Sequence, residues 1–462
     1  MILPMTYPES VIKSLFTDEE SEQIHQLFSK FVVTTGQLEQ IKTVTEQNMK
    51  FGSSLSPTDR QKTTLLMENT FIEKNLSGNE NGTYLGLDLG GTNLRLFRVK
   101  FVNGKADTNL KYYKMPAECF KGPSLQVFEF MADCIKDFLT YDNLDKCGRL
   151  PLGFTFSFPS TKKSLTDVEL IIWTKTFKCT DGPGMNVGQT LEDCLKRKNI
   201  PVDLVAIISD VTAALVAGHY LDKQSCIGLI LGTGCNVCYI ENVKSIEKWQ
   251  SEPDKSKKVI INIEWGGLSD TGCLSFIQNE FDYEVDKLSN HVNSFTYEKM
   301  FSGLYLGELV RQVLADLTKK KILFKGEGSD KLFTPWSWDS SKVSDIERDK
   351  DGSDENTKKA LDSFDLGGVT SKRDLVLTQF VCSFMSQRGA YVLSAGLAAV
   401  VDRINQPEVT IAVDGSLYEQ HPKYHDYMLS VIHTLSPQSK TNIVLVKDSS
   451  VQGCAFAAAI VE

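Results

Sequence analysis

A strand-like run that ends in a glycine-bearing turn occurs three times in this chain, and it constrains the fold more than any other feature. The three copies are "YLGLDLGGTNLRLFRVKF" at 84–101, "CIGLILGTGCNVCYIE" at 226–241 and "VTIAVDGSLY" at 409–418. Alternating apolar residues around central glycines predict β-hairpins, and we expect the turn at Gly90-Gly91 to need positive φ. Turns of one kind spread over more than 300 residues indicate a single pocket built from a repeated unit.

Asp88 stands at the end of the first of these strands. A carboxylate in such a place costs desolvation energy unless it has a partner, and the adjacent glycines expose backbone N–H groups that can hold an anion. Two interpretations stay open for this stretch alone. Asp88 either caps a tight hairpin or belongs to a phosphate site.

Between the repeats, helical and strand patterns alternate, which is typical of an α/β protein. The order of expected elements is helix 124–144, strand 150–159, helix 188–199, strand 202–210 and helix 211–221. Asp210 therefore falls at a strand-to-helix junction, and ligands of open α/β sheets gather at the carboxyl ends of strands. By itself Asp210 could equally be the N-cap of the helix, with Ser209 as the competing cap.

The remaining segments are less informative. Residues 9–50 predict one or two amphipathic helices, and the polar stretch 75–83 is a candidate hinge. The polar stretches 245–258 and 325–358 are expected to be exposed insertions, the second partly disordered.

Length and charge exclude several classes of function. A chain of 462 residues suggests two domains, and a net charge of −9 argues against nucleic acid or an anionic membrane as the main partner. The start of the chain shows no secretory signal, and no apolar run is long enough for a membrane span. We therefore expect a cytoplasmic protein.

The cysteines fit the same compartment. Eleven of them, an odd number without paired spacing, indicate reduced thiols. The one close pair, Cys235 and Cys238, lies on an expected strand, where residues three apart point to opposite faces, so this pair does not predict a metal site.

Glycine turns that present N–H groups suit a polyphosphate, and the hydroxyl of Thr92 or Thr233 can add a donor. The chain has neither the P-loop pattern G-x-x-x-x-G-K-[ST] nor a Rossmann fingerprint. The glycines are therefore expected to serve another nucleotide-binding fold.

Eight motifs in order give the chain a family resemblance. It resembles the eukaryotic hexokinases, of the sugar kinase, actin and heat-shock chaperone superfamily, as a divergent, fungal-like member. The motifs are "LGLDLGGTNLRL", "LPLGFTFSFPS", "IIWTKTF", "DVTAAL", "LGTGCNV", "INIEWGG", "YEKMFSGLYLGELVR" and "AVDGSLY". The resemblance implies a two-lobed actin-like (ribonuclease H-like) α/β fold with a cleft between the lobes. The implied large lobe is 1–77 and 210–446, and the small lobe is 78–209 and 447–462.

The resemblance also implies roles for individual residues. Asp210 would be the general base, Lys175 a catalytic cation, and Asp88 would act on Mg²⁺ through water. The hexose would be held by Ser157, Thr174, Lys175, Ser209, Asp210, Asn236, Glu264 and Glu298. ATP would be bound by Asp88, Gly90, Gly91, Thr92, Asn93, Arg95, Gly232, Thr233, Gly234, Gly415 and Ser416.

Phosphoryl transfer explains why such residues are needed. The reaction requires positioning and neutralisation of charge, and a carboxylate must accept the proton of the attacking hydroxyl. Glu and Asn side chains match the vicinal hydroxyls of a hexose. Taken singly, Glu298 could be an ordinary helix-start acid and Lys175 a surface lysine near a turn.

Several positions depart from the family pattern. Ser209 stands where the family has Asn, Thr176 where it has Gly, and Val292-Asn293 where a Pro-Gly is usual. Ser449 and Val451 replace two glycines of a flexible turn near the hinge.

The sequence therefore predicts an ATP-dependent hexose 6-kinase, acting on glucose, mannose or fructose at the first step of glycolysis, as a monomer or homodimer. Two alternatives stay open. One is a sugar-sensing paralogue with little turnover, suggested by Ser209 and the altered glycines. The other is an N-acetylhexosamine kinase.

Overall fold

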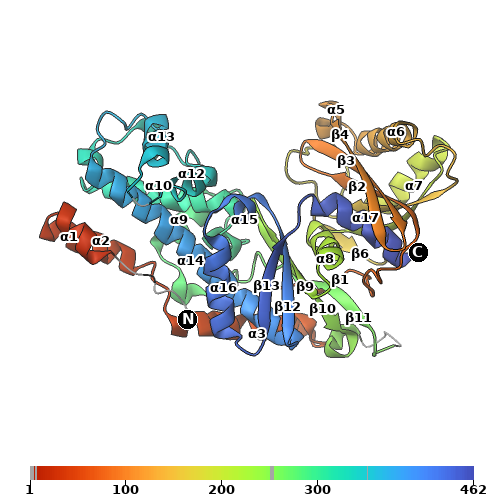
Figure 1. The fold of residues 1–462 in the computed structure, drawn as a ribbon, viewed down its shortest axis with the longest axis horizontal. Coiled ribbons are helices and arrows are strands. Elements are labelled where there is room, and N and C mark those ends of the chain that lie inside the picture. The colour runs from red at the N-terminus through yellow and green to blue at the C-terminus, as the bar shows by residue number, and fades with distance from the viewer. Residues whose placement is uncertain (1–4, 6–7, 250–253, 351) are drawn as a thin grey trace.

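The computed structural model describes residue 5 and residues 8–249, 254–350 and 352–462. Two sheets of the same design dominate it (Figure 1). In each, three strands form an antiparallel meander, and two further strands continue in parallel beside the first strand of that meander. The α/β class is confirmed, and the sequence repeat corresponds to a repeated sheet.

The strands fall into three sheets. The larger sheet has the order β1 (Glu68–Asn69), β11 (Lys258–Asn262), β10 (Cys235–Asn242), β9 (Ser225–Leu231), β12 (Glu408–Asp414), β13 (Lys440–Leu445). The smaller sheet has the order β4 (Lys105–Lys114), β3 (Asn93–Val102), β2 (Gly82–Leu89), β5 (Leu150–Thr155), β8 (Val202–Ile208). A short pair consists of β6 (Ser160–Lys162) and β7 (Val168–Leu170).

Helices surround both sheets. The lobe of the smaller sheet carries α5 (Glu118–Lys121), α6 (Leu125–Tyr141), α7 (Val187–Arg197) and α17 (Ser449–Val461). The remaining helices are α1 (Glu9–Leu15), α2 (Asp18–Ser29), α3 (Thr35–Ser53), α4 (Pro57–Arg60), α8 (Asp210–Leu221), α9 (Glu280–Leu288), α10 (Gly303–Lys319), α11 (Asp330–Phe333), α12 (Ser340–Ile346), α13 (Glu355–Ser363), α14 (Lys372–Ile404), α15 (Ser416–Gln420) and α16 (Tyr424–Leu435). Short 3-10 turns are η1 (Val243–Ser245), η2 (Glu247–Trp249), η3 (Ser275–Ile277), η4 (Glu298–Met300) and η5 (Phe324–Gly326).

Capping residues decide where the N-terminal helices begin. Residues 9–50 form α1, α2 and most of α3, one helix more than predicted. Thr17 with Glu20, and Thr34 with Gln37, make capping boxes at the starts of α2 and α3. The caps explain why one amphipathic stretch is divided, since each satisfies free N–H groups at a new helix start.

Helices α8 and α17 lie between the two sheets and join the lobes (Figure 1). Small residues allow this close packing. A Cβ on Gly228 of β9 would lie 2.6 Å from the Val211 carbonyl of α8, and a Cβ on Gly453 of α17 would lie 2.1 Å from the Ala213 carbonyl. On the other side of α17, a Cβ on Gly153 of β5 would lie 1.8 Å from the Cys454 carbonyl. The order of layers is larger sheet, α8, α17, smaller sheet.

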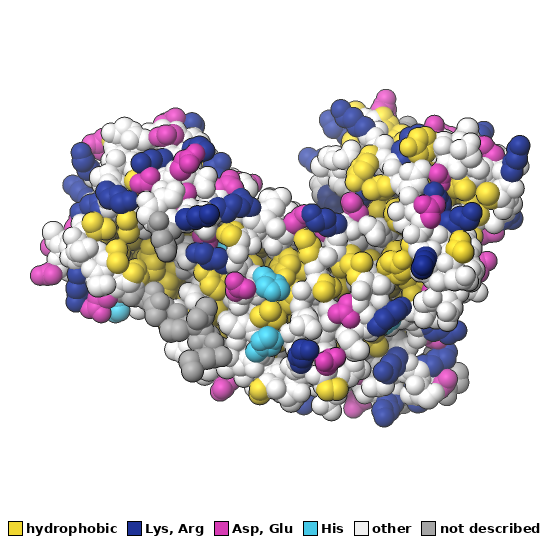
Figure 2. Space-filling model, in the orientation of Figure 1, with side chains coloured by type: hydrophobic (Ala, Val, Ile, Leu, Met, Phe, Trp, Pro, Cys, Tyr) yellow, Lys and Arg dark blue, Asp and Glu magenta, His cyan; other side chains and the backbone are white. Residues whose placement is uncertain are grey.

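A hollow separates the two lobes on one face of the molecule (Figure 2). Each lobe has its own apolar core, and a third apolar cluster fills the space around α8 and α17. The hollow is therefore bounded by two separately packed bodies and a thin connecting layer.

One prediction about loops is wrong. The described residues of 325–358 are not an exposed, partly disordered insertion, because they form α11, α12 and part of α13 and bury Leu332, Trp338 and Ile346 in the core. The prediction relied on the polar composition of this stretch and overlooked its few apolar residues, which the helices bury. Part of the other stretch, 250–253, lies outside the described residues, and its flanks form η2 and the start of β11.

The expectation of positive φ at Gly90-Gly91 is also wrong. Neither residue is among the positive-φ glycines. Gly90 is needed instead because a Cβ there would lie 2.9 Å from the Asn93 carbonyl, which accepts the Gly90 N–H at 3.0 Å. The turn is tight, but it is not left-handed.

We predict that Gly453→Ala lowers the free energy of unfolding by about 1–3 kcal/mol, because the added methyl group overpacks the contact with α8. Gly36→Ala is the matched control, since Gly36 is an exposed residue of α3 with open space around its Cβ position. That control should be neutral or stabilising by up to about 1 kcal/mol. Urea unfolding of both variants measures the difference, and equal effects would contradict the packing argument.

Candidate functional site

Asp88 is the last but one residue of β2 and is buried, with 5% of its surface exposed. Arg95 of β3, its neighbour across the hairpin, donates to Asp88 Oδ2 from Nε at 2.8 Å and forms an ion pair through Nη2, also at 2.8 Å. Arg95 Nη1 reaches Asp448 Oδ1 at 3.0 Å, just before α17. Burial raises the pKa of Asp88, and Arg95 opposes that rise. Asp88 is thus part of a network of charges and not a simple turn cap.

The first turn joins β2 to β3 as predicted. Thr92 and Asn93 are exposed at its tip, and the Thr92 carbonyl accepts the Met115 N–H at 3.3 Å. Thr176, one of the residues that depart from the family pattern, donates its hydroxyl to the Gly91 carbonyl. This bond ties the turn to the loop that carries Lys175.

Lys175 is exposed in that loop and has φ of 57°. Its Nζ lies 4.9 Å from the centre of the Phe158 ring, and its charge acts on Asp88. Thr174 beside it is half-buried, and its carbonyl accepts the Phe177 N–H at 3.2 Å. Lys175 therefore is not an isolated surface lysine.

Asp210 is the first residue of α8, and Ser209 is the N-cap. The Ser209 hydroxyl accepts the Thr212 N–H at 3.5 Å and lies 3.0 Å from Thr212 Oγ1. The N-cap interpretation of Asp210 is thus wrong, because Ser209 already fills that position. Asp210 is instead held by its own N–H, which donates to Ser157 Oγ at 3.1 Å, while its Oδ1 accepts the Val211 N–H at 2.8 Å.

The second and third turns lie against each other. Gly415 has φ of 135°, and a Cβ there would lie 2.3 Å from the Leu231 carbonyl and 2.7 Å from the Gly232 nitrogen. The Gly232 carbonyl accepts the Gly303 N–H at 2.7 Å, and the Thr233 carbonyl accepts the Leu304 N–H at 3.0 Å. Only glycine fits this close backbone approach, which leaves Thr233 exposed at its tip and Ser416 exposed at the start of α15.

One cavity of about 430 Å³ joins residues from three of these elements. Arg95 comes from the first hairpin, Asp210 from α8 and Gly415 from the third turn. Its full lining is Arg95, Asp210, Ile230, Asp414, Gly415, Glu419, Lys447, Asp448 and Ser450. The expected single pocket is met in part: the cavity unites the first hairpin and the third turn with the Asp210 junction, whereas its lining includes neither Thr233 of the second turn nor Lys175.

A second group of predicted residues meets at the ends of β10 and β11. Asn236 Nδ2 donates to Glu264 Oε1 at 2.6 Å, and Asn262 Nδ2 donates to the same oxygen at 2.7 Å. Glu298 Oε2 accepts the Cys235 N–H at 2.9 Å, next to Gly234. Glu298 begins η4 and so does stand at a helix start, but its carboxylate binds the second glycine turn.

Three carboxyl groups crowd this region, and nearby lysines only partly offset their charge. Burial raises the pKa of Glu264, and the Asp210 charge adds to that rise. Burial together with Glu264 raises the pKa of Glu298 to about 7 and that of Glu68 to about 7. Within the described residues, no lysine or arginine forms an ion pair with any of these three glutamates. Groups with pKa values shifted in this way are typical of functional sites.

Sequence reasoning missed three residues here. Asn262 lies in the motif "INIEWGG" and could have been found, because it is two residues from Glu264. Glu68 of β1 belongs to no recognisable motif. It reaches the site only because β1 pairs with β11, where Glu68 Oε2 accepts a hydrogen bond from Asn262 Nδ2 at 3.2 Å. Lys162 of β6 is half-buried, and desolvation lowers its pKa to about 7 although the Glu68 charge opposes this shift. It donates to the Ile207 carbonyl, three residues before Asp210.

The C-terminal departures are structured, not flexible. Ser449 is the first residue of α17, and Val451 is fully buried in it. The Ser449 hydroxyl and N–H both donate to Asp414 Oδ2, the N–H at 3.1 Å. This contact ties α17 to the third turn.

The described residues contain no group of three or more His, Cys, Asp or Glu arranged to hold a metal, and Cys235 and Cys238 therefore belong to no such group. None of the helices in the described residues is both long enough and apolar enough to cross a membrane.

Comparison with known proteins gives one consistent result. Two models of the family described as hexokinase match residues 23–220 and 226–460. Human Hexokinase-1 is 36% identical over 452 residues, which cover 96% of this chain and 48% of that protein. Human Hexokinase HKDC1 is 35% identical over 450 residues, again 96% of this chain and 48% of the relative. The chain spans about half the length of these curated relatives.

Solved structures agree. A hexokinase from Schistosoma mansoni complexed with glucose is 34% identical and superposes with a TM-score of 0.85, covering 96% of this chain and all of that one. A second hexokinase structure, 23% identical with a TM-score of 0.83 and coverage of 96% and 100%, has the same fold. The two-lobed actin-like fold is confirmed, and this chain belongs to the hexokinase family.

Proposed function

We propose that this protein transfers the γ-phosphoryl group of ATP to the 6-hydroxyl of a hexose, such as glucose, mannose or fructose, at the entry step of glycolysis. Asp210 is the general base. The observation that carries the proposal is the position of Asp210. Asp210 lines the same cavity as Arg95 and Gly415, and its charge acts on Glu264. A base must lie between the acceptor and the transferred phosphoryl group, and this position meets that need.

The two groups of residues divide the substrates between them. The cluster of Asn236, Glu264 and Glu298 offers amide donors and carboxylate acceptors for sugar hydroxyls, supported by Ser157 and by Thr174 and Lys175 of the neighbouring loop. The three turns, with Asp88, Asn93, Arg95, Gly232 and Ser416 among them, offer backbone N–H groups and a cation for the phosphates. The Ser209 hydroxyl already caps α8, so any sugar contact from it competes with that cap.

The donor set fits Mg²⁺ that arrives with the nucleotide. Magnesium is usually held by one or two carboxylates together with substrate phosphates and water, not by a protein cage. Asp210 supplies such a carboxylate at the cavity, and Asp88, bound to the cavity residue Arg95, would hold the ion through water. When bound, the ion would neutralise charge on the phosphates.

The lobe boundaries that we propose are those predicted from the sequence, near residues 77, 209 and 446. Residues before 77 supply β1 to the larger sheet, and residues after 447 supply α17 to the smaller one. Closure about these crossings would exclude water, which competes with the sugar as acceptor.

We predict that Asp210→Asn lowers the turnover number for glucose 6-phosphate formation by about 100- to 10,000-fold, because the base is lost. Asp330→Asn is the matched control, since Asp330 is also the first residue of a helix whose N-cap is a serine. A coupled assay with Mg-ATP and glucose, mannose, fructose or N-acetylglucosamine measures both. Full turnover in Asp210→Asn would contradict the assignment.

The same assay separates the alternatives. Negligible turnover of every sugar, in a wild-type protein that glucose still stabilises against heat, would indicate a sugar sensor. Preference for N-acetylglucosamine over glucose would indicate an N-acetylhexosamine kinase.

Thr176→Val should raise the KM for Mg-ATP by about threefold to tenfold and leave the KM for the sugar unchanged, because the turn loses its bond at Gly91. Thr176→Ser keeps the hydroxyl and is the control. Identical nucleotide KM values for the two variants would show that the bond does not position the turn.

Glu298 should make stability depend on pH. The unfolded chain releases the Glu298 proton near pH 4.5, whereas the folded protein keeps it to about pH 7. The stability contribution is therefore full below pH 4.5 and lost as pH rises through 7. Relative to Glu298→Gln, the wild type should lose up to about 3 kcal/mol of unfolding free energy between pH 4 and pH 8, values that bracket that window.

Urea unfolding at several pH values measures this difference. Glu39→Gln, at an exposed glutamate of α3, is the control and should run parallel to the wild type. If the unfolding free energy of Glu298→Gln changed with pH in the same way as that of the wild type, burial of this carboxyl would not be the source of the pH dependence.

A further inference from the structure

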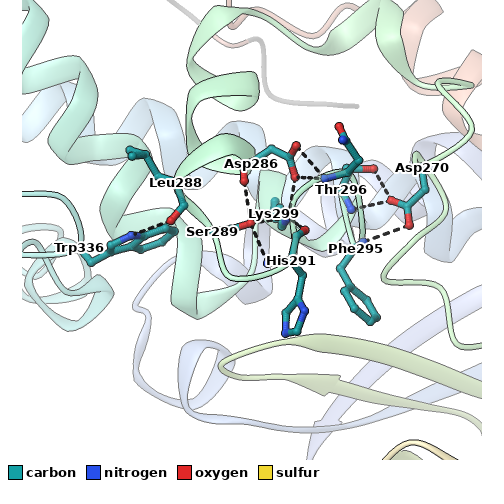
Figure 3. A network of polar contacts seen from close by, with 10 residues as sticks. Asp270, Asp286, Leu288, Ser289, His291, Phe295, Thr296, Lys299 and Trp336 are labelled. Carbon is teal, nitrogen blue, oxygen red and sulfur yellow. Dashed lines mark hydrogen bonds and ion pairs between the residues drawn. The ribbon is translucent and has the colours of Figure 1, made fainter. Parts of the chain in front are cut away.

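The loop between α9 and η4 is exposed but firmly held (Figure 3). Asp286 accepts the Asn293 N–H at 3.1 Å on Oδ1 and 3.0 Å on Oδ2. Asp270 accepts the Phe295 N–H at 3.1 Å, and Thr296 donates to it from N at 2.8 Å and from Oγ1 at 2.6 Å. Two carboxylates thus fix the path of a surface loop.

Lys299 anchors the loop from below. It is buried, with 3% of its surface exposed, and its Nζ donates to Asp286 Oδ1 at 2.6 Å, Ser289 Oγ at 2.8 Å and the His291 carbonyl at 2.6 Å. A lysine buried this deeply needs all three partners. They all come from the α9 end of the loop, whereas Lys299 itself belongs to η4. The loop and η4, which begins at Glu298, are therefore held as one unit.

The anchoring forces an unfavourable backbone onto an aromatic residue. Asn293 has φ of 60° and Phe295 has φ of 59°, in the left-handed region. Asn tolerates this region, whereas a bulky residue rarely adopts it. Strain of this kind persists only where the surroundings impose it, and it is found most often at ligand sites.

The strained backbone directs an aromatic ring outward beside Glu298. Phe295 is 43% exposed, so core packing does not explain it. A Cβ on Gly266 would lie 3.2 Å from Phe295 Cδ1 and 3.3 Å from Glu298 Oε2, so the ring and the carboxylate flank the same spot. In Figure 3 the side chains of Phe295 and His291 point away from the polar network to the same side, and their rings meet edge to face at 5.8 Å.

We propose that Phe295 is an aromatic wall of the sugar subsite beside Glu298 and sets which hexoses are accepted. This inference rests on the proposed function. The ring contacts C–H groups of the sugar and offers no donor or acceptor for a hydroxyl. A site that hydrogen-bonds a hydroxyl strongly rejects the analogue that lacks it, whereas an apolar wall discriminates weakly. The protein therefore accepts hexoses that lack, or carry a substituent at, the hydroxyl facing Phe295.

The test is a scan of glucose against 1,5-anhydroglucitol and the 2-, 3- and 4-deoxyglucoses. In the wild type, one of these sugars should keep a kcat/KM within about tenfold of glucose. Phe295→Asn suits the left-handed backbone and adds an amide that can bind a hydroxyl. For that one sugar, the ratio of the glucose kcat/KM to the analogue kcat/KM should rise at least tenfold, and the KM for Mg-ATP should not change. Phe333→Asn, at another exposed phenylalanine, is the control and should change no ratio.

Each outcome decides the question. Glucose turnover with the same ratios in Phe295→Asn and wild type overturns the aromatic wall but leaves the proposed function intact. A wild type that neither phosphorylates nor is stabilised by any sugar overturns both. If Phe295→Asn does not fold, Phe295→Leu decides: a glucose KM about threefold higher, with the nucleotide KM unchanged, supports the wall, and an unchanged glucose KM overturns it.

Discussion

The close packing of α8 between the larger sheet and α17 is the constraint on which the rest of the structure depends. Backbone meets backbone at Gly228 and Gly453, so α8 cannot shift without moving both lobes. The N-terminus of α8 carries Asp210, and its position relative to the three turns is set by this contact. Stability and the geometry of the site therefore have the same source, because interiors at this density transmit displacement.

The carboxyl groups of the site lower the stability of the folded chain. Glu68, Glu264 and Glu298 lie half-buried near one another, and each has a raised pKa. Groups so placed lower the stability of the folded chain above neutral pH, and a sugar that donates hydroxyl protons to them would offset that cost. Phe295 belongs to the same pattern, since strain at its backbone is held by Asp270.

The departures from the family pattern prove to be local substitutions with local partners. Thr176 binds the Gly91 carbonyl, and Ser449 binds Asp414. Each adds a contact between elements that a glycine would leave free. In this chain the first turn is consequently tied to the Lys175 loop, and the third turn is tied to α17.

The sequence by itself determined the repeated strand and turn unit, the α/β class, the junction at Asp210 and the family, because period, glycine placement and motif order are local properties of the chain. It misjudged the turn at Gly90 and the helices of 325–358, where backbone clashes and distant core contacts decide the conformation. Only the tertiary structure placed Glu68 beside Asn262 and Phe295 beside Glu298. These contacts depend on strand pairing and loop anchoring between segments far apart in the chain, which no local pattern records.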